Sequence, residues 1–211
     1  FGNFVRKHSY VDMDYVYGTL SNTDGEDPLN FDALMANPAE YFAVACNVET
    51  GEPVYLDKSC ITRDHYDVCK ASCALPVACH PYEAGGVLCL DGGMADPVPI
   101  QKAFDDGCDK VVLILTKPRD TVRQAKDDAI FAKLLRLRYP KAAAQLALRY
   151  KKYNDGVALA KEYEKQGKLL IVAPDSIGNL TTLGRTKEDL DMLYEKGLKD
   201  GQQIKAFLER T

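Results

Sequence analysis

The chain has 211 residues, of which 46% are hydrophobic and 27% charged, and its formal net charge is -4. These values are ordinary for a single globular domain, and the acidic balance argues against nonspecific binding to nucleic acid, so we expect no nucleic-acid partner. No apolar run is long enough to cross a bilayer and no signal peptide is visible at Phe1, which predicts a cytoplasmic protein.

Predicted helices and strands alternate along the chain. The first half is expected to contain a short helix capped by Asn30, a strand over 41–48 paired with 54–56, a helix opened by Thr62, and a strand over 87–90. The second half is expected to contain a helix over 100–106, a strand over 111–115, two helices separated by Pro140, a strand over 169–172, and a helix from a capping box at Thr186 to about Leu208. This alternation predicts an α/β fold with a mostly parallel sheet covered by helices on both faces, in one domain over residues 1–211.

Residues 117–152 form a basic segment. They include eleven Lys or Arg against three Asp, and the stretch 130–139 is amphipathic if helical. One interpretation is that the segment makes peripheral contact with anionic membrane lipid. The other is a solvated helix pair packed on the sheet, which the alanine-rich residues 142–148 favour because small side chains indicate close helix packing.

The cysteine pattern bears on redox and metal chemistry. The seven cysteines are an odd number, and several fall in apolar segments: Cys46, Cys60, Cys69, Cys73, Cys79, Cys89 and Cys108. We interpret them as reduced, buried, small hydrophobic residues. No Cys-x-x-Cys pair occurs and the three histidines show no ligand spacing, so we expect neither a metal nor another cofactor.

The continuous apolar run 87–90 predicts a strand buried on both faces, and a carboxylate follows directly after it. Asp91 stands at the predicted strand end, and Gly92 and Gly93 come next. Ligands of open α/β sheets bind beyond the carboxyl ends of such strands, and glycines allow a sharp turn and close approach to the carboxylate. The alternative is a plain hairpin turn, for which Asp-Gly is a common signal.

The residues around this turn resemble the patatin-like phospholipase family, in its small bacterial branch. The match is carried by Ala71, Ser72, Ala74, Pro76, Asp91, Gly92, Gly93, Pro97, Pro99, Ala103 and Gly107. Such proteins are serine acyl hydrolases that use a Ser-Asp dyad without a histidine, so the resemblance implies that Asp91 is the base and that the substrate is a lipid or small acyl ester. A carboxylate can activate a serine only where its surroundings raise its basicity, which an apolar strand end can do.

Other residues are expected to shape the site. Gly92 and Gly93 would form the turn that presents Asp91, with Ser72 and Pro76 close by, and we interpret Ser72 as a structural hydroxyl rather than the nucleophile. Met94, Ala95 and His80 could border the pocket, although a structural role for His80 is the simpler interpretation. Asp96 stands where the family often has Asn, a difference that affects local hydrogen bonding.

The family's nucleophile lies in a Gly-x-Ser-x-Gly elbow, which this sequence lacks. None of the five serines, which are Ser9, Ser21, Ser59, Ser72 and Ser176, has glycine at both required positions. We therefore expect the C-terminal portion of an acyl hydrolase domain, inactive alone, whose serine lies upstream of Phe1. The alternative is a non-catalytic protein that binds lipid or a partner on the same scaffold. A nucleotide-binding module has no support, because neither Gly-x-Gly-x-x-Gly nor a P-loop occurs.

Overall fold

A computed structural model describes residues 11–178 and 186–209, which divide into two compact units. Unit 1 comprises Phe1–Pro97 and Gln124–Lys152, and unit 2 comprises Val98–Arg123 and Tyr153–Thr211. The single domain expected from the sequence stays a prediction, and each unit is described by itself. Within the described ranges, no helix is both long and apolar enough to cross a membrane.

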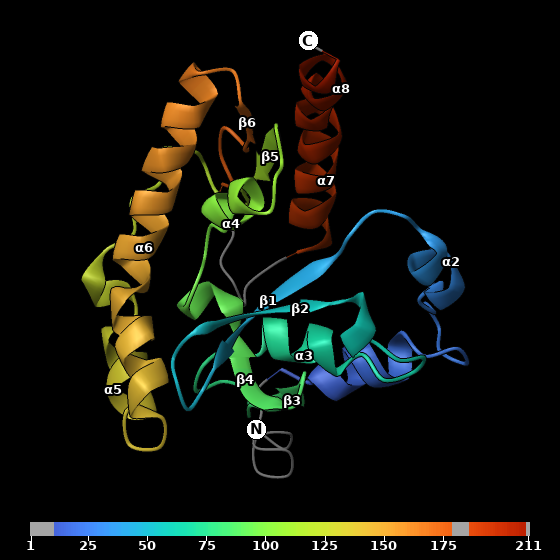
Figure 1. Cartoon of the computed structure of the whole chain (residues 1–211), viewed down its shortest axis with the longest axis vertical. Coiled ribbons are helices and arrows are strands. Elements are labelled where there is room, and N and C mark those ends of the chain that lie inside the picture. Colours follow the sequence, from blue (N-terminus) through green and yellow to red (C-terminus); the bar gives the residue numbers. More distant parts are fainter. Residues whose placement is uncertain (1–10, 179–185, 210–211) are drawn as a thin grey trace. The chain divides into compact units, whose positions relative to one another are not determined.

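Unit 1 contains the larger sheet and most of the short helices (Figure 1). Its elements are a π-helical turn at Tyr15–Leu20, α2 (Phe31–Ala36), β1 (Phe42–Asn47), β2 (Pro53–Asp57), a 3-10 turn at Lys58–Cys60, α3 (Asp67–Cys73), β3 (Tyr82–Ala84), β4 (Val87–Asp91), 3-10 turns at Gly92–Met94 and Ala125–Asp127, α5 (Ala129–Leu135) and the first half of α6 (Pro140–Lys165). Local signals explain several boundaries. The Asn30 side chain caps α2 by accepting a hydrogen bond from the Ala33 N–H at 3.0 Å, as predicted.

The helix expected to begin at Thr62 begins five residues later. Thr62 forms an isolated antiparallel bridge with His65, and α3 begins at Asp67. Asp64 has a φ of 63°, a left-handed conformation that a helix cannot continue. The polar turn therefore overrides the helical spacing that the sequence suggests.

The main sheet has the strand order β2-β1-β4-β3, and all its pairings are antiparallel. The expectation of a mostly parallel sheet is therefore wrong, although the α/β class holds. Two of the pairings are hairpins, because their connections are too short for the crossover that parallel neighbours need. Gly85 and Gly86 join β3 to β4 with φ of 59° and 77°, as a tight two-residue hairpin turn requires.

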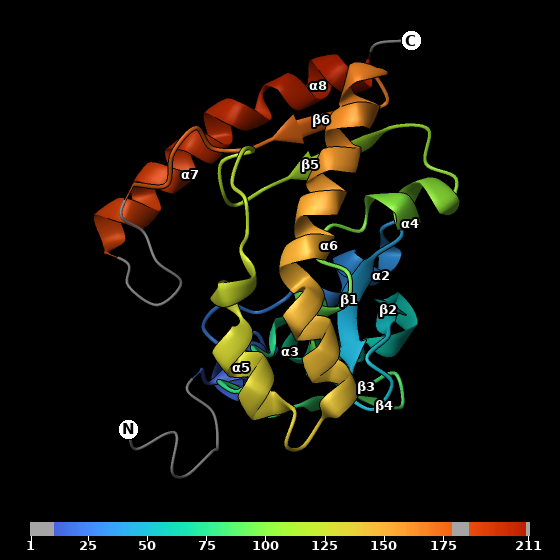
Figure 2. The same cartoon turned by 90° about the vertical axis from the view of Figure 1, so that its left-hand side faces the viewer.

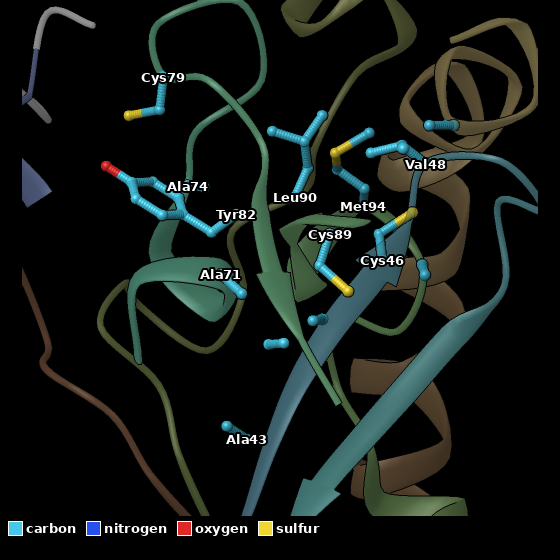
Figure 3. Packing of buried hydrophobic residues seen from close by; sticks show 14 of the residues in the cluster. Ala43, Cys46, Val48, Ala71, Ala74, Cys79, Tyr82, Cys89, Leu90 and Met94 are labelled. Atoms are coloured by element: carbon cyan, nitrogen blue, oxygen red, sulfur yellow. The ribbon is translucent and has the colours of Figure 1, made fainter. Parts of the chain in front are cut away.

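The core of unit 1 lies between this sheet and the helices packed on it. Helix α3 contacts β1, β3 and β4. Figure 3 shows the side chains of Cys46, Val48, Cys89, Leu90 and Met94 gathered at β1 and β4. The same cluster includes the inward residues of α5 and α6, which are Ala132, Leu135, Ala142, Ala143 and Leu146. The helix pair predicted on either side of Pro140 is present, and one face of it packs into the core.

Unit 2 is built on a two-stranded parallel sheet. Its elements are α4 (Ile100–Asp105), β5 (Val111–Ile114), the second half of α6, β6 (Leu169–Val172), α7 (Lys187–Gly201) and α8 (Gln203–Leu208). Gly156 on α6 allows a close approach, because a Cβ there would lie 2.8 Å from the Cβ of Val98. Thr186 and Asp189 form the predicted capping box, but the single helix expected to Leu208 is divided into α7 and α8.

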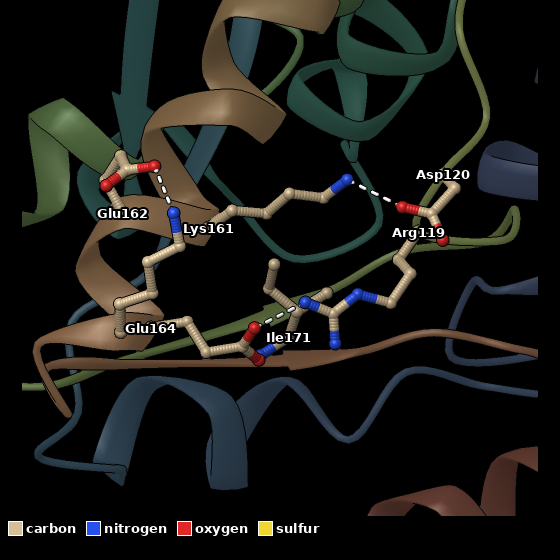
Figure 4. Close-up of polar contacts among 7 residues, drawn as sticks. Arg119, Asp120, Lys161, Glu162, Glu164 and Ile171 are labelled. Carbon is tan, nitrogen blue, oxygen red and sulfur yellow. Dashed lines mark hydrogen bonds and ion pairs between the residues drawn. The ribbon is translucent and has the colours of Figure 1, made fainter.

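Polar contacts in unit 2 attach the segment after β5 to α6 (Figure 4). Arg119 pairs with Glu164, and Lys161 pairs with Asp120 at 2.7 Å. The second carboxylate oxygen of Glu164 accepts a hydrogen bond from the backbone N–H of Ile171 in β6 at 3.0 Å. Glu164 thus connects the loop, the helix and the strand.

Candidate active site

Asp91 is the last residue of β4 and the cap of the turn that follows. Its carboxylate accepts a hydrogen bond from the Gly93 N–H at 2.7 Å. Its own N–H donates to the Ala74 carbonyl oxygen at 2.9 Å, just after α3, and Asp91 stands opposite Ala45 of β1. The side chain is half-buried. Strand, helix end and turn together fix the carboxylate at the end of the strand, where the sequence placed it.

Gly92 is required by the closeness of β1. A Cβ at this position would lie 2.1 Å from the carbonyl oxygen of Val44 and 2.4 Å from its carbonyl carbon, both of which are backbone atoms. The Gly92 carbonyl oxygen accepts hydrogen bonds from the N–H groups of Ala95 at 3.0 Å and Asp96 at 2.9 Å. The turn is therefore closed by backbone bonds, and only glycine fits at its first position.

Ser72 contacts the same atom of β1. Its hydroxyl donates to the Val44 carbonyl oxygen at 2.7 Å, which fits a structural hydroxyl. Pro76 is buried, and Val77 after it has a φ of 68°, an uncommon conformation for a β-branched residue. The two segments that carry the family resemblance, around Ser72 and around Asp91, therefore meet at β1.

The three residues expected at the pocket border lie in different surroundings. Met94 is fully buried in the core cluster, and Ala95 is 4% exposed. The His80 ring lies 4.3 Å from the Tyr82 ring, centroid to centroid, tilted by 39°. The described contacts are packing contacts, and a role in substrate binding for these residues stays a prediction.

Sequence reasoning missed the polar residues that hold the turn from outside. The Lys152 ammonium donates to the Ala95 carbonyl oxygen and to the Gln145 side-chain oxygen, both at 2.6 Å. The Tyr55 hydroxyl donates to the Asp96 carboxylate at 2.5 Å. These partners come from α6 and β2, far from the turn in sequence, and no local pattern identifies them. Asp96, where the family often has Asn, thus has a defined partner.

Two thiols lie in the core below Asp91, and neither suits a nucleophile. The pKa of Cys46 is raised to about 12, mainly by burial; Cys89 and Asp91 contribute to this rise, and the nearby Lys152 opposes it. Burial raises the pKa of Cys89 to about 11. Because the thiolate is the reactive form, both groups are unreactive near neutral pH.

The remaining cysteines also form no disulfide, and all seven are free thiols. Cys46, Cys79 and Cys89 are buried, whereas Cys108 is exposed, contrary to the expectation of uniform burial. Within residues 11–178 and 186–209, no three His, Cys, Asp or Glu side chains lie together as a metal site would require.

The part of the chain that carries the Asp91 turn matches a known protein family. Residues 2–104 match the family model of patatin-like phospholipases. This patatin-like segment includes Asp91, Gly92 and Gly93, so the resemblance seen in the sequence is confirmed.

A second family model and one relative also match the chain. Residues 139–210, beyond the patatin-like segment, match a family described as a domain of unknown function (DUF6363). The chain is 29% identical over 122 residues to the uncharacterized protein YjjU of Escherichia coli strain K12. This alignment covers 54% of the chain and 32% of the relative, so the chain spans about a third of that protein's length.

Proposed function

We propose that this chain supplies the general base, Asp91, of a serine acyl hydrolase that acts on lipid or small acyl esters. The observation that carries the proposal is the position of Asp91. Its carboxylate lies at the end of β4, held by the Gly93 N–H at 2.7 Å, inside the segment that matches the patatin-like phospholipase model. A fixed carboxylate at a strand end is what a Ser-Asp dyad requires.

In the proposed reaction, Asp91 accepts the hydroxyl proton of the catalytic serine while the serine oxygen attacks the ester carbonyl carbon. Collapse of the tetrahedral intermediate expels the alcohol, which takes the proton from Asp91, and leaves an acyl-serine. Asp91 then accepts a proton from water as the water oxygen attacks the acyl-serine. Release of the carboxylic acid returns the proton to the serine.

The serine itself is proposed to lie upstream of Phe1. None of the five serines in residues 1–211 stands in a Gly-x-Ser-x-Gly elbow. The Ser72 hydroxyl is bonded to backbone, and the Cys46 and Cys89 thiols are protonated near neutral pH. We accordingly predict that the isolated chain hydrolyses no esters. We also propose that residues 117–152 make peripheral contact with the membrane. A cytoplasmic location is part of the same proposal.

Sequencing the gene upstream of Phe1 and labelling its complete product with a fluorophosphonate tests the proposal. Peptide mass spectrometry should locate the label on a serine outside residues 1–211, and the Asp91→Asn variant should be labelled much more slowly. A label on Ser72 would overturn the assignment of the nucleophile. A gene without an upstream elbow serine, together with no labelling, would instead favour a non-catalytic lipid- or partner-binding protein.

A further inference from the structure

The hairpin formed by α5 and the start of α6 exposes large apolar side chains. Ile130 is 71% exposed and Leu137, in the turn between the helices, is 88% exposed. Phe131 and Leu134 on α5 are also about half exposed. Figure 2 shows the ribbons of α5 and of the start of α6 side by side. Three of these four side chains, Ile130, Leu134 and Leu137, recur at helical spacing and form one stripe. We use the term apolar tip for Ile130, Phe131, Leu134 and Leu137.

The opposite face of the same hairpin explains why it keeps its shape. Ala132, Leu135, Ala142, Ala143 and Leu146 are buried in the core cluster of unit 1. Asp128, only 4% exposed, pairs with Arg149 and joins the start of α5 to α6. The hairpin is therefore anchored by one face, and the apolar tip is not needed for that packing.

The charged residues within 129–153 are all positive, whereas Asp127 and Asp128 come just before this stretch. Residues 129–153 contain no Asp or Glu, and they include Lys133, Arg136, Arg138, Lys141, Arg149, Lys151 and Lys152. The chain as a whole is acidic, with a net charge of -4. Lys133, Arg136 and Arg138 are exposed and alternate with residues of the tip. A cationic surface with protruding apolar side chains is complementary to an anionic lipid surface.

A groove beside the tip has the same character. It has a volume of about 450 Å³ and is lined by Ala132, Lys133, Arg136, Pro140, Ala143, Ala144 and Ala147. Its floor is apolar, and its two cations come from α5 and the turn that follows. Lys and Arg keep their charged ends at the headgroup level while their stems lie along apolar surface, which suits this geometry.

We propose that the α5–α6 hairpin docks onto anionic lipid bilayers, with Ile130, Leu134 and Leu137 entering the boundary of the acyl chains and Lys133, Arg136 and Arg138 contacting phosphates. The biological role of this docking rests on the proposed function, because an enzyme held at a bilayer meets its lipid esters at the lipid surface.

A single tryptophan tests the insertion of the tip. The chain contains no tryptophan, so Leu137→Trp introduces the sole indole. Its emission should shift to the blue with vesicles of phosphatidylcholine and phosphatidylglycerol, and not with phosphatidylcholine alone. Leu198→Trp on α7, where Leu198 is 53% exposed, is the matched control and should not shift. An equal shift in both variants, or none in Leu137→Trp, would overturn the proposal.

Charge variants test the headgroup contacts by vesicle sedimentation. The double variant K133Q/R136Q should bind mixed vesicles about thirtyfold more weakly, since each cation near an anionic surface contributes about fivefold. Binding of the wild type should also weaken as salt is raised. The control K187Q/K205Q, whose lysine side chains are 81% and 85% exposed, should bind like the wild type. Equal binding by both double variants would contradict the proposal, after circular dichroism has shown that each is folded.

Two further outcomes separate this proposal from its rivals and from the proposed function. A blue shift of Leu137→Trp that grows with protein concentration in the absence of lipid would show that the tip binds a second copy, and would overturn lipid docking. Vesicle binding needs no catalytic serine. Binding without hydrolysis of a soluble acyl ester by the complete protein would therefore count against the proposed function alone, and hydrolysis without vesicle binding against docking alone.

Discussion

The hydroxyl of Ser72 and the carbonyl oxygen of Val44 form a 2.7 Å hydrogen bond at the point where Gly92 passes closest to β1. One backbone atom of β1 thus fixes both the end of α3 and the turn that carries Asp91. The position of the proposed base depends on this contact, because Asp91 is also bonded through its own N–H to Ala74 at the end of the same helix.

Replacing Gly92 by alanine should destabilise unit 1. The new Cβ would lie 2.1 Å from the Val44 carbonyl oxygen, so backbone must move, and we expect a loss of roughly 2–3 kcal/mol in the free energy of unfolding. Urea unfolding measures it. Gly197→Ala on α7 is the matched control: its Cβ meets nothing within 4 Å, and a gain of roughly 0.5–1 kcal/mol is expected from helix propensity. Equal effects of the two variants would refute the close contact.

Ser72→Ala should affect stability rather than chemistry. It leaves the Val44 carbonyl oxygen without its side-chain donor, at a cost of about 1–2 kcal/mol. In the complete enzyme the turnover number should remain within a few-fold of the wild type. Loss of turnover with unchanged unfolding would show instead that Ser72 takes part in the reaction.

The ion pair between Asp128 and Arg149 should contribute to the stability of the α5–α6 hairpin. Asp128→Asn removes the charge opposite a mostly buried guanidinium, whose side chain is 18% exposed, and should cost roughly 2–3 kcal/mol in chemical denaturation. The exposed pair Lys187 and Asp191 is the control, and Asp191→Asn should leave the unfolding midpoint unchanged. A neutral effect of Asp128→Asn would mean that the helices are held by apolar packing alone.

The buried thiol of Cys46 should make the fold sensitive to alkali. Its pKa is raised from the ordinary 9.0 to about 12, so the folded state holds the proton more tightly than the unfolded state. This contribution to stability is complete below about pH 9 and is lost as pH rises toward 12. Unfolding free energy should therefore fall less steeply above pH 9 in Cys46→Ala than in the wild type, while Cys108→Ala, at an exposed position, should not differ in slope.

Local signals predicted much of the fold. The Asn30 cap, the capping box at Thr186 and the β1–β2 hairpin depend on neighbouring residues and were predicted correctly. The sheet direction was not, because β4 pairs with β1, more than forty residues away in sequence. The apolar run 87–90 suggested a strand buried on both faces, but Leu88 is 36% exposed.

In the candidate site, too, local features were predicted and long-range contacts were not. The sequence predicted the Asp91 turn because a strand end, a carboxylate and two glycines are contiguous. Tyr55 and Lys152 reach the turn only through the tertiary fold, 41 and 57 residues from their partners, so composition and spacing carry no trace of them. The burial of Met94 was not predicted either, because its neighbours come from separate strands.

Ester hydrolysis by the complete gene product shows whether Asp91 is the base. Asp91→Asn should lower kcat for a p-nitrophenyl acyl ester by about 10²–10⁴-fold. Asp96→Asn is the matched control, because it alters a carboxylate five residues away, bonded to Tyr55, and introduces the residue often found in the family; it should retain activity. Equal activity of Asp91→Asn and the wild type would show that Asp91 is not the base.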